Sequence, residues 1–287
     1  MSFKQFLFEG GKATAKFHTK RATKPDIEVA IEFVSSTLGI DKQSIIDNLV
    51  GSTVLTYNGD REDSGDIDIV FETEHKDEYV KKMSEATNEP YVIANVTYSF
   101  PVPVSDTKMV QVDFTFSDNI EWAKFSYHAD KNSKYKSGVR NEFLHSVVKY
   151  TPKDGEDLKV KDENGNLIVK AARSFRLDKG FERVFKIAPE RKDGKGRVKS
   201  MQSVEPDAID AELKKLDKEG SYSKDADLIT DPDKFASMLF GEGVKAKDIM
   251  TAEQVIALIK KRPDAVKVFA DAKKGLEKRK LEIPEGI

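Results

Sequence analysis

The sequence contains no cysteine, only four histidines and no long apolar run. Without cysteine the chain has no disulfide, no thiol nucleophile and no thiolate zinc site. The histidines (His18, His75, His128 and His145) lack the HExxH spacing, which argues against a zincin. The longest apolar runs fall far short of the roughly 18 residues that a membrane span requires, and the first residues lack the apolar stretch of a secretory signal. We therefore expect a cytoplasmic protein without membrane contact, whose chemistry uses carboxylates, hydroxyls, lysine and arginine.

What the chain does contain is a strong asymmetry of charge. Its 287 residues, 34% of them charged, have a net charge of −2 and a length typical of about two domains. Residues 1–123 carry 12 Lys/Arg against 21 Asp/Glu, whereas residues 124–200 carry 20 against 11. An acidic block followed by a basic block favours metal-binding carboxylates that face a surface for phosphates. A solvated charged surface without a ligand is the alternative.

The first half of the chain alternates between helical and strand-like patterns. The run Thr23-Lys24-Pro25-Asp26 is typical of a helix start, with proline just inside it. A polar loop at 58–65 separates two strand-like runs. We expect helices at 25–38, 41–50, 75–87, 119–125 and 137–150, and strands at 52–57, 66–72, 91–100 and 109–116.

The second half changes character twice. Asn164-Gly165 lies between two alternating runs within 158–175, which predicts a β-hairpin. A further strand at 181–191 and a basic loop at 191–200 follow. Helical patterns with cap candidates then occupy 207–220, 231–241, 251–262 and 264–280. Together these patterns predict an α+β fold.

The segment most informative about chemistry contains Asp66-Ile67-Asp68-Ile69. Alternate residues of a strand share a face, so Asp66 and Asp68 project together while the isoleucines point into the core. Two adjacent carboxylates repel each other and favour a divalent cation such as Mg²⁺ between them. A half-buried edge strand with a polar outer face is the common alternative for such a pair.

Three further residues strengthen the metal hypothesis. Gly51 permits close approach of the backbone to a phosphate, and Ser52 adds a hydroxyl and an amide as donors. Asp113 lies between Val112 and Phe114 in another expected strand, so it projects away from the core. Adjacent strands would bring Asp66, Asp68 and Asp113 within reach of the same pair of ions.

This pattern resembles the DNA polymerase beta-like nucleotidyltransferase superfamily. Its signature is a hydrophobic residue with Gly-Ser, about a dozen residues, Asp-x-Asp flanked by hydrophobics, and a third Asp on a later strand. The corresponding residues are Val50-Gly51-Ser52, Asp66-Ile67-Asp68 and Val112-Asp113-Phe114. Many members have a serine directly before the first Asp, whereas here Gly65 separates Ser64 from Asp66, as a one-residue insertion would. The resemblance covers roughly residues 25–150.

The resemblance implies a fold and a division of the chain. The fold is a nucleotidyltransferase-type mixed β-sheet flanked by helices, with an added β-hairpin region and a helical C-terminal region. The expected parts are an N-terminal extension at 1–22, a catalytic domain at 23–150, a basic hairpin region at 151–200 and a helical domain at 201–287.

The resemblance also implies a role for each residue. Asp66, Asp68 and Asp113 would be catalytic and would hold two Mg²⁺ (or Mn²⁺) ions, with Asp113 helping to deprotonate the attacking hydroxyl. Gly51 and Ser52 would bind the phosphates of a nucleoside triphosphate such as ATP. Basic residues on a helix after the third carboxylate often bind the triphosphate, which makes Lys136 and Arg140 candidates; solvated charge or an ion pair is the alternative.

The acceptor is left open among RNA, a host protein and a small molecule. Residues 124–200 and their surroundings mix Lys/Arg with aromatic side chains, a composition that suits phosphate backbones and stacked bases. A role in the hydrophobic core is the alternative for these aromatics. They are Trp122, Phe125, Tyr127, Tyr135, Phe175, Phe181 and Phe185.

The first residues carry a second resemblance. MSFKQFLFEGG is similar to the leaders that target internal head proteins of large tailed bacteriophages, which are cut after a Leu-x-Glu motif; here that motif is Leu7-Phe8-Glu9. The resemblance implies a protein packaged in a phage head and delivered to the host cytoplasm.

The carboxylate motif makes a metal-dependent nucleotidyltransferase the leading hypothesis. The alternative is a non-catalytic nucleic-acid-binding or virion protein that keeps the fold.

Overall fold

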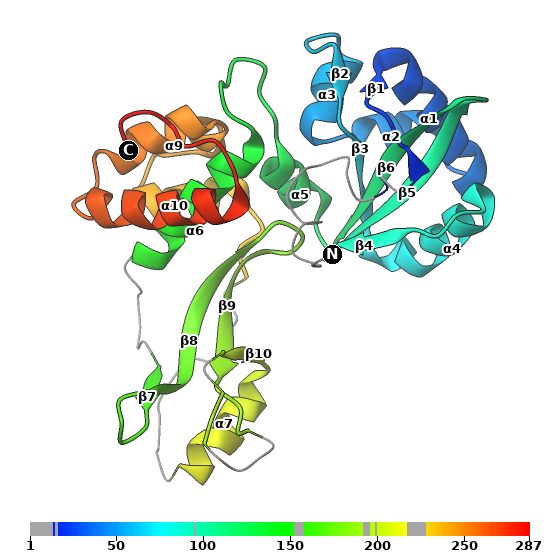
Figure 1. Ribbon diagram of the computed structural model, residues 1–287. Helices are drawn as coiled ribbons and strands as arrows, with labels where there is room; N and C mark the ends of the chain where they lie inside the picture. The colour runs from blue at the N-terminus through cyan, green and yellow to red at the C-terminus, as the bar shows by residue number, and fades with distance from the viewer. Residues whose placement is uncertain are drawn as a thin grey trace.

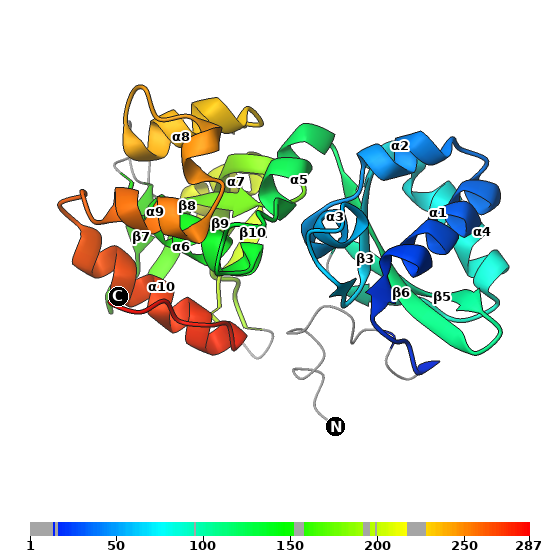
Figure 2. The same ribbon diagram turned by 90° about the horizontal axis from the view of Figure 1, so that it is seen from above.

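A computed structural model describes residues 14, 17–94, 96–151, 158–191, 196–198, 200–216 and 228–287. It contains both helices and strands, in one mixed and two antiparallel sheets, which confirms the α+β class. Figure 1 and Figure 2 show one group of helices around the first four-stranded sheet and a second group at the other side of the molecule. Among the described residues, no helix combines the length and the apolarity needed to cross a bilayer. The predicted leader at 1–9 lies outside the described residues.

The first sheet has the strand order β3-β6-β5-β4. Strand β3 runs parallel to β6, and the remaining pairs are antiparallel. Alternation gives this sheet one apolar face, which contributes to the first hydrophobic core, and one polar face. The strands are β3 (Ile67–Glu72), β4 (Val92–Ala94), β5 (Thr97–Ser105) and β6 (Lys108–Ser117).

Three helices pack against the apolar side: α1 (Lys24–Leu38), α2 (Lys42–Asp47) and α4 (Lys76–Thr87), with the short 3₁₀ helix η3 (Thr73–His75) before α4. The local sequence explains the bounds of α1. Thr23 and Asp26 form a capping box, Pro25 lies in the first turn, and Gly39 ends the helix in the left-handed region. The predicted helix start at Thr23 is confirmed.

The strand predicted at 52–57 is wrong, because this segment is helix α3 (Gly51–Tyr57). Its threonine, valine and tyrosine favour strands, but tertiary contacts decide. The preceding residues pair with β3: Val50 N donates to Asp68 O at 3.1 Å, and Val70 N donates to Asn48 O at 3.0 Å. Gly51, with φ of 63°, then turns the chain into the helix.

The second hydrophobic core joins residues from the middle and the end of the chain. Helices α5 (Ile120–Tyr127) and α6 (Ser137–Tyr150) pack with α8 (Pro232–Phe240), α9 (Ala252–Ile259), α10 (Ala265–Arg279) and the 3₁₀ helix η4 (Ala246–Ile249). Figure 2 shows α5 at the side of this group that is nearest the first sheet. The proposed domain limits stay predictions, and the aromatic side chains Trp122, Phe125, Phe175 and Phe181 are buried in this core.

The second four-stranded sheet is antiparallel, in the order β10-β9-β8-β7. The predicted hairpin is present: Asp162 N donates to Asn166 O at 2.8 Å, and Gly165 has φ of 79°. One face packs against α7 (Pro206–Lys215) in a third core that includes Phe185. Figure 1 shows the sheet extending from the C-terminal helices. Its strands are β7 (Lys159–Lys161), β8 (Leu167–Arg176), β9 (Gly180–Ile187) and β10 (Gln202–Val204).

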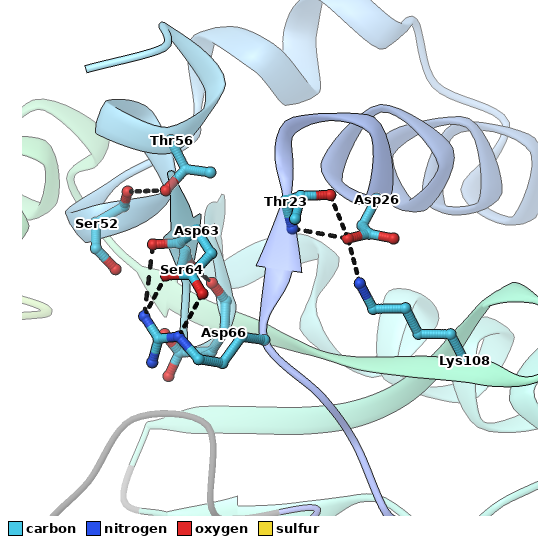
Figure 3. Close-up of polar contacts among 9 residues, drawn as sticks. Thr23, Asp26, Ser52, Thr56, Asp63, Ser64, Asp66 and Lys108 are labelled. Carbon is cyan, nitrogen blue, oxygen red and sulfur yellow. Dashed lines mark hydrogen bonds and ion pairs between the residues drawn. The ribbon is translucent and has the colours of Figure 1, made fainter. Parts of the chain in front are cut away.

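A two-stranded clip connects the start of the described chain to the loop before β3. Strand β1 (Ala22–Thr23) pairs antiparallel with β2 (Asp63–Ser64). Figure 3 shows Thr23 and Asp63 on these strands, with Asp26 and Lys108 paired nearby. The clip places Ser64 directly beside the first residue of the Asp-x-Asp motif.

Candidate functional site

Asp66, Asp68 and Asp113 converge at the polar face of the first sheet. Asp68 and Asp113 are register partners on the parallel strands β3 and β6, and Asp66 immediately precedes β3. Each residue offers a carboxylate oxygen, and these atoms all lie within 4.8 Å of one another. The structure therefore brings together the three carboxylates that the sequence singles out.

Backbone contacts fix the Asp-x-Asp segment. The buried Thr53 hydroxyl on α3 accepts from Asp68 N at 2.9 Å and donates to Asp66 O at 3.3 Å. Ser64 also donates to Asp66 O. Figure 3 shows Ser64 and Asp66 close together beside the start of α3, where Ser52 lies. One helix and one clip thus hold both ends of the motif.

Gly51 lies directly against Asp68. A β-carbon built on Gly51 would lie 2.9 Å from Asp68 Oδ2, and the residue has φ of 63°. Both conditions select glycine, because a larger residue strains the backbone and pushes on the carboxylate. The Gly51-Ser52 dipeptide and the Asp-x-Asp motif are therefore neighbours in space as well as in sequence.

Asp113 is oriented by two polar neighbours on the same face. Gln111 Nε2 donates to both of its carboxylate oxygens, at 2.9 and 3.0 Å. Ser99, its partner on β5, also hydrogen-bonds to it. Each of these residues is buried, although each is polar. Their burial makes the face a dense polar network.

Burial and mutual repulsion shift the acidities of the site. Burial raises the pKa of Asp113 to about 7, and the charge of Asp66 adds to this effect. The pKa of Asp68 is raised well above its ordinary value, first by burial and then by the charges of Asp66 and Asp113. Nearby, burial raises the pKa of Tyr127 to about 12. Asp68 and Asp113, whose pKa values are raised in this way, release protons when a cation binds between them.

The donor set fits a hard divalent cation. Three carboxylates supply oxygen ligands, which Mg²⁺ and Mn²⁺ prefer. The raised pKa values of Asp68 and Asp113 come first from burial and then from the neighbouring carboxylates, and a bound cation would offset both effects. A second acidic group, formed by Glu72, Glu74 and His75, has exposed carboxylates and lies at the end of β3 and in η3.

The candidate triphosphate ligands are placed differently. Ser52 lies next to Gly51 on α3, and Lys136 is an exposed residue directly before α6. Arg140 is only 1% exposed, and its guanidinium donates to the carbonyl oxygens of Phe125, Ser126 and Met250. This placement contradicts a triphosphate role for Arg140, because its guanidinium already serves protein carbonyls. Solvated charge is wrong for Arg140 as well, and within the described part of the chain its hydrogen-bond partners are carbonyl and amide oxygens rather than a carboxylate.

Sequence reasoning missed three residues that shape the site, namely Thr53, Ser99 and Gln111, and noted Ser64 only for its distance from Asp66. Gln111 could have been predicted from the sequence, because it lies two residues before Asp113 in the same expected strand and therefore shares a face with it. Ser99 and Thr53 gave no comparable signal. Their roles depend on the pairing of β5 with β6 and on a helix where a strand was expected.

The sequence was also compared with known proteins. It matches no protein-family model, and no curated protein is significantly similar to it.

Proposed function

We propose that this protein is a metal-dependent nucleotidyltransferase, which moves a nucleoside monophosphate from a nucleoside triphosphate to a hydroxyl acceptor. The observation that carries the proposal is the convergence of Asp66, directly before β3, with Asp68 and Asp113 on the adjoining parallel strands β3 and β6. The nucleotidyltransferase-type fold is part of the proposal. The mixed sheet, with helices on its apolar face and carboxylates on its polar face, supports it.

Asp66, Asp68 and Asp113 would hold two Mg²⁺ or Mn²⁺ ions. Bound there, such ions lower the pKa of an attacking hydroxyl and neutralise charge on the transferred phosphoryl group. Gly51 and Ser52 would receive the triphosphate, since their backbone adjoins Asp68 without a side chain in between. Asp113, held by Gln111 and Ser99, would accept the proton of the acceptor hydroxyl.

The decisive experiment is a transfer assay with each radiolabelled nucleoside triphosphate, Mg²⁺ or Mn²⁺, and total bacterial RNA and protein. The double variant Asp66→Asn/Asp68→Asn should lose transfer. A matched control, Glu72→Gln/Glu74→Gln, neutralises the exposed acidic group instead and should keep it. Label moving to one band with wild type and control alone would support the proposal. If wild type showed neither transfer nor metal-dependent nucleotide binding, the proposal would fail.

RNA is the acceptor that the second sheet favours. Lys159, Lys170 and Lys186 are direct cross-strand partners, so they form one row across β7, β8 and β9. Val169 and Ala171 flank Lys170 and pack towards α7, so the row lies on the opposite face. A row of positive charge suits a polyanion that crosses the strands. The buried aromatics of this region, in contrast, offer no stacking surface.

Salt dependence tests this acceptor class. Binding of a mixed-sequence single-stranded RNA should weaken with salt. Alanine at Lys159, Lys170 and Lys186 should reduce the slope of the logarithm of the binding constant against the logarithm of the salt concentration by about 2. Alanine at Lys76, Lys81 and Lys82 of α4 provides a control that removes equal charge elsewhere. Label on a protein band, with RNA binding unchanged by the row variant, would favour a protein acceptor. RNA binding without any metal-dependent nucleotide binding would favour the non-catalytic alternative.

A further inference from the structure

The described chain reaches the carboxylate site before its first helix begins. We call Thr14 and residues 17–23 the N-terminal arm. Lys20 N donates to Met109 O at 2.8 Å, and Lys20 forms a parallel bridge with Val110. The pairing of β3 with β6 begins only at Val112. The arm therefore continues along β6 where β3 has not yet begun.

A continuous hydrogen-bond path leads from the arm to Asp113. Thr14 N and the Thr14 hydroxyl both donate to Gln111 Oε1, at 3.1 and 3.0 Å. The other end of the same amide, Nε2, donates to both carboxylate oxygens of Asp113. Thr14 is fully buried and Gln111 is 2% exposed, so little water competes for these bonds.

The direction of the Gln111 amide matters for Asp113. An amide has a donor end and an acceptor end, and the hydrogen-bond network decides which end faces which neighbour. Two donors from Thr14 hold the oxygen away from Asp113. Without them, rotation of the amide would turn its oxygen towards a carboxylate, and the two would repel each other.

The arm also contacts the other end of the site. Arg21 forms a bidentate ion pair with Asp63, with both N–O distances at 2.9 Å. Asp63 precedes Ser64, which donates to Asp66 O. The hydrogen bond to Asp63 raises the pKa of Arg21, and the charge of Asp66 makes a smaller contribution in the same direction. Contacts of the arm thus lead to both Asp113 and Asp66, two of the three carboxylates.

We propose that the N-terminal arm is a positioning element of the carboxylate site, in which Thr14, through Gln111, orients Asp113 for divalent-cation binding. This inference rests on the proposed function, because it assigns the carboxylates to a cation. In this proposal Thr14 and Gln111 are not cation ligands themselves and act only through Asp113. Partners of metal ligands fix ligand orientation, and their loss typically lowers metal affinity by about 10- to 100-fold.

Mn²⁺ binding, measured by electron paramagnetic resonance on the full chain, tests the inference without any transfer reaction. Gln111→Met should weaken binding about 10-fold, because it removes the donor on Asp113. Thr14→Val should weaken it less, since its backbone N–H remains. Thr14→Ser restores the hydroxyl donor and should recover the affinity that Thr14→Val loses. In the double variant the two losses should not add, because both act through one path.

Gln43→Met is the matched control. Gln43 makes the same type of contact, an amide on the carboxylate of Asp47 at 2.8 Å, on the exposed surface of α2. It should bind Mn²⁺ as wild type does. Thermal unfolding without metal separates folding from orientation, since a merely structural role would lower stability and leave the affinity of the folded protein unchanged.

The outcomes distinguish the two proposals. If wild type binds Mn²⁺ and Asp113→Asn does not, while Thr14→Val and Gln111→Met bind as wild type does, the positioning role is overturned and the proposed function stands. If wild type binds no Mn²⁺, both fail. A graded loss from Thr14→Val to Gln111→Met, with recovery in Thr14→Ser, supports the arm.

Discussion

Two of the regions that bury charge in this molecule do so in opposite ways. In the helical region, Arg140 is buried among carbonyl oxygens that accept its hydrogen bonds. In the carboxylate site, Asp66, Asp68 and Asp113 are placed against one another, so like charges meet. A buried charge with matching partners holds a fold together, whereas buried charges that repel each other await a ligand. The comparison explains why one group is structural and the other is our candidate site.

The largest expected effect comes from removing the structural charge. Arg140→Met should lower the free energy of unfolding by about 3–5 kcal/mol, because three carbonyl groups from α5 and the segment before α9 lose their donor. Urea unfolding measures this loss. Lys136→Met, four residues earlier and exposed, should change stability by less than about 0.5 kcal/mol. Equal losses of stability in the two variants would show that the burial of Arg140 among carbonyl groups does not stabilise the fold.

Neutralising one of the carboxylates that repel each other should raise the free energy of unfolding, the opposite of the effect expected for Arg140→Met. The pKa of Asp113 is about 7 in the folded protein and near 3.8 in the unfolded chain, so the folded state binds its proton more tightly. That contribution is full below the unfolded pKa and is lost as pH rises through 7. Asp113→Asn should therefore stabilise the metal-free protein by about 1–3 kcal/mol at pH 8 and by much less at pH 5.

Urea unfolding in the presence of a chelator, at both pH values, provides the measurement. Added Mg²⁺ should reduce the difference in the free energy of unfolding between Asp113→Asn and wild type at pH 8, because only the wild type retains all three carboxylates for the ion. A metal-free Asp113→Asn that is less stable than wild type at pH 8 would contradict the view that the buried, ionised Asp113 destabilises the metal-free fold.

The sequence predicted the carboxylate site better than its supports. Alternation around Asp66-Ile67-Asp68 and around Val112-Asp113-Phe114 is a local signal, and it survives folding because strands keep a period of two. The partners of Arg140 are a different case. Met250 is 110 residues away, so no pattern near Arg140 identifies it as a carbonyl-bound residue. The charge of Arg140 and its place on a helix could be predicted from the sequence, but its burial could not.

The helix at 51–57 shows a second limit. Local composition favoured a strand there, while non-local pairing of Asn48 and Val50 with β3 fixed the chain just before Gly51. Thr53 and Thr56, three residues apart, are the buried residues of this helix. That spacing fits a helix face, yet two threonines in a run of seven give too weak a signal to outweigh β-propensity.

The smallest expected difference concerns two glycines with similar backbone strain. Gly51 and Gly59 have φ of 63° and 81°, so alanine at either position should cost about 1 kcal/mol. Only Gly51 adjoins a carboxylate: its added β-carbon would lie 2.9 Å from Asp68 Oδ2, whereas that of Gly59 meets nothing within 4 Å. Gly51→Ala should therefore lower stability slightly more than Gly59→Ala and, by displacing Asp68, weaken Mn²⁺ binding several-fold. Thermal unfolding and Mn²⁺ titration of the pair measure the difference. If Mn²⁺ affinity changed equally in both variants, the loss would come from backbone strain alone, and Gly51 would have no part in shaping the carboxylate site.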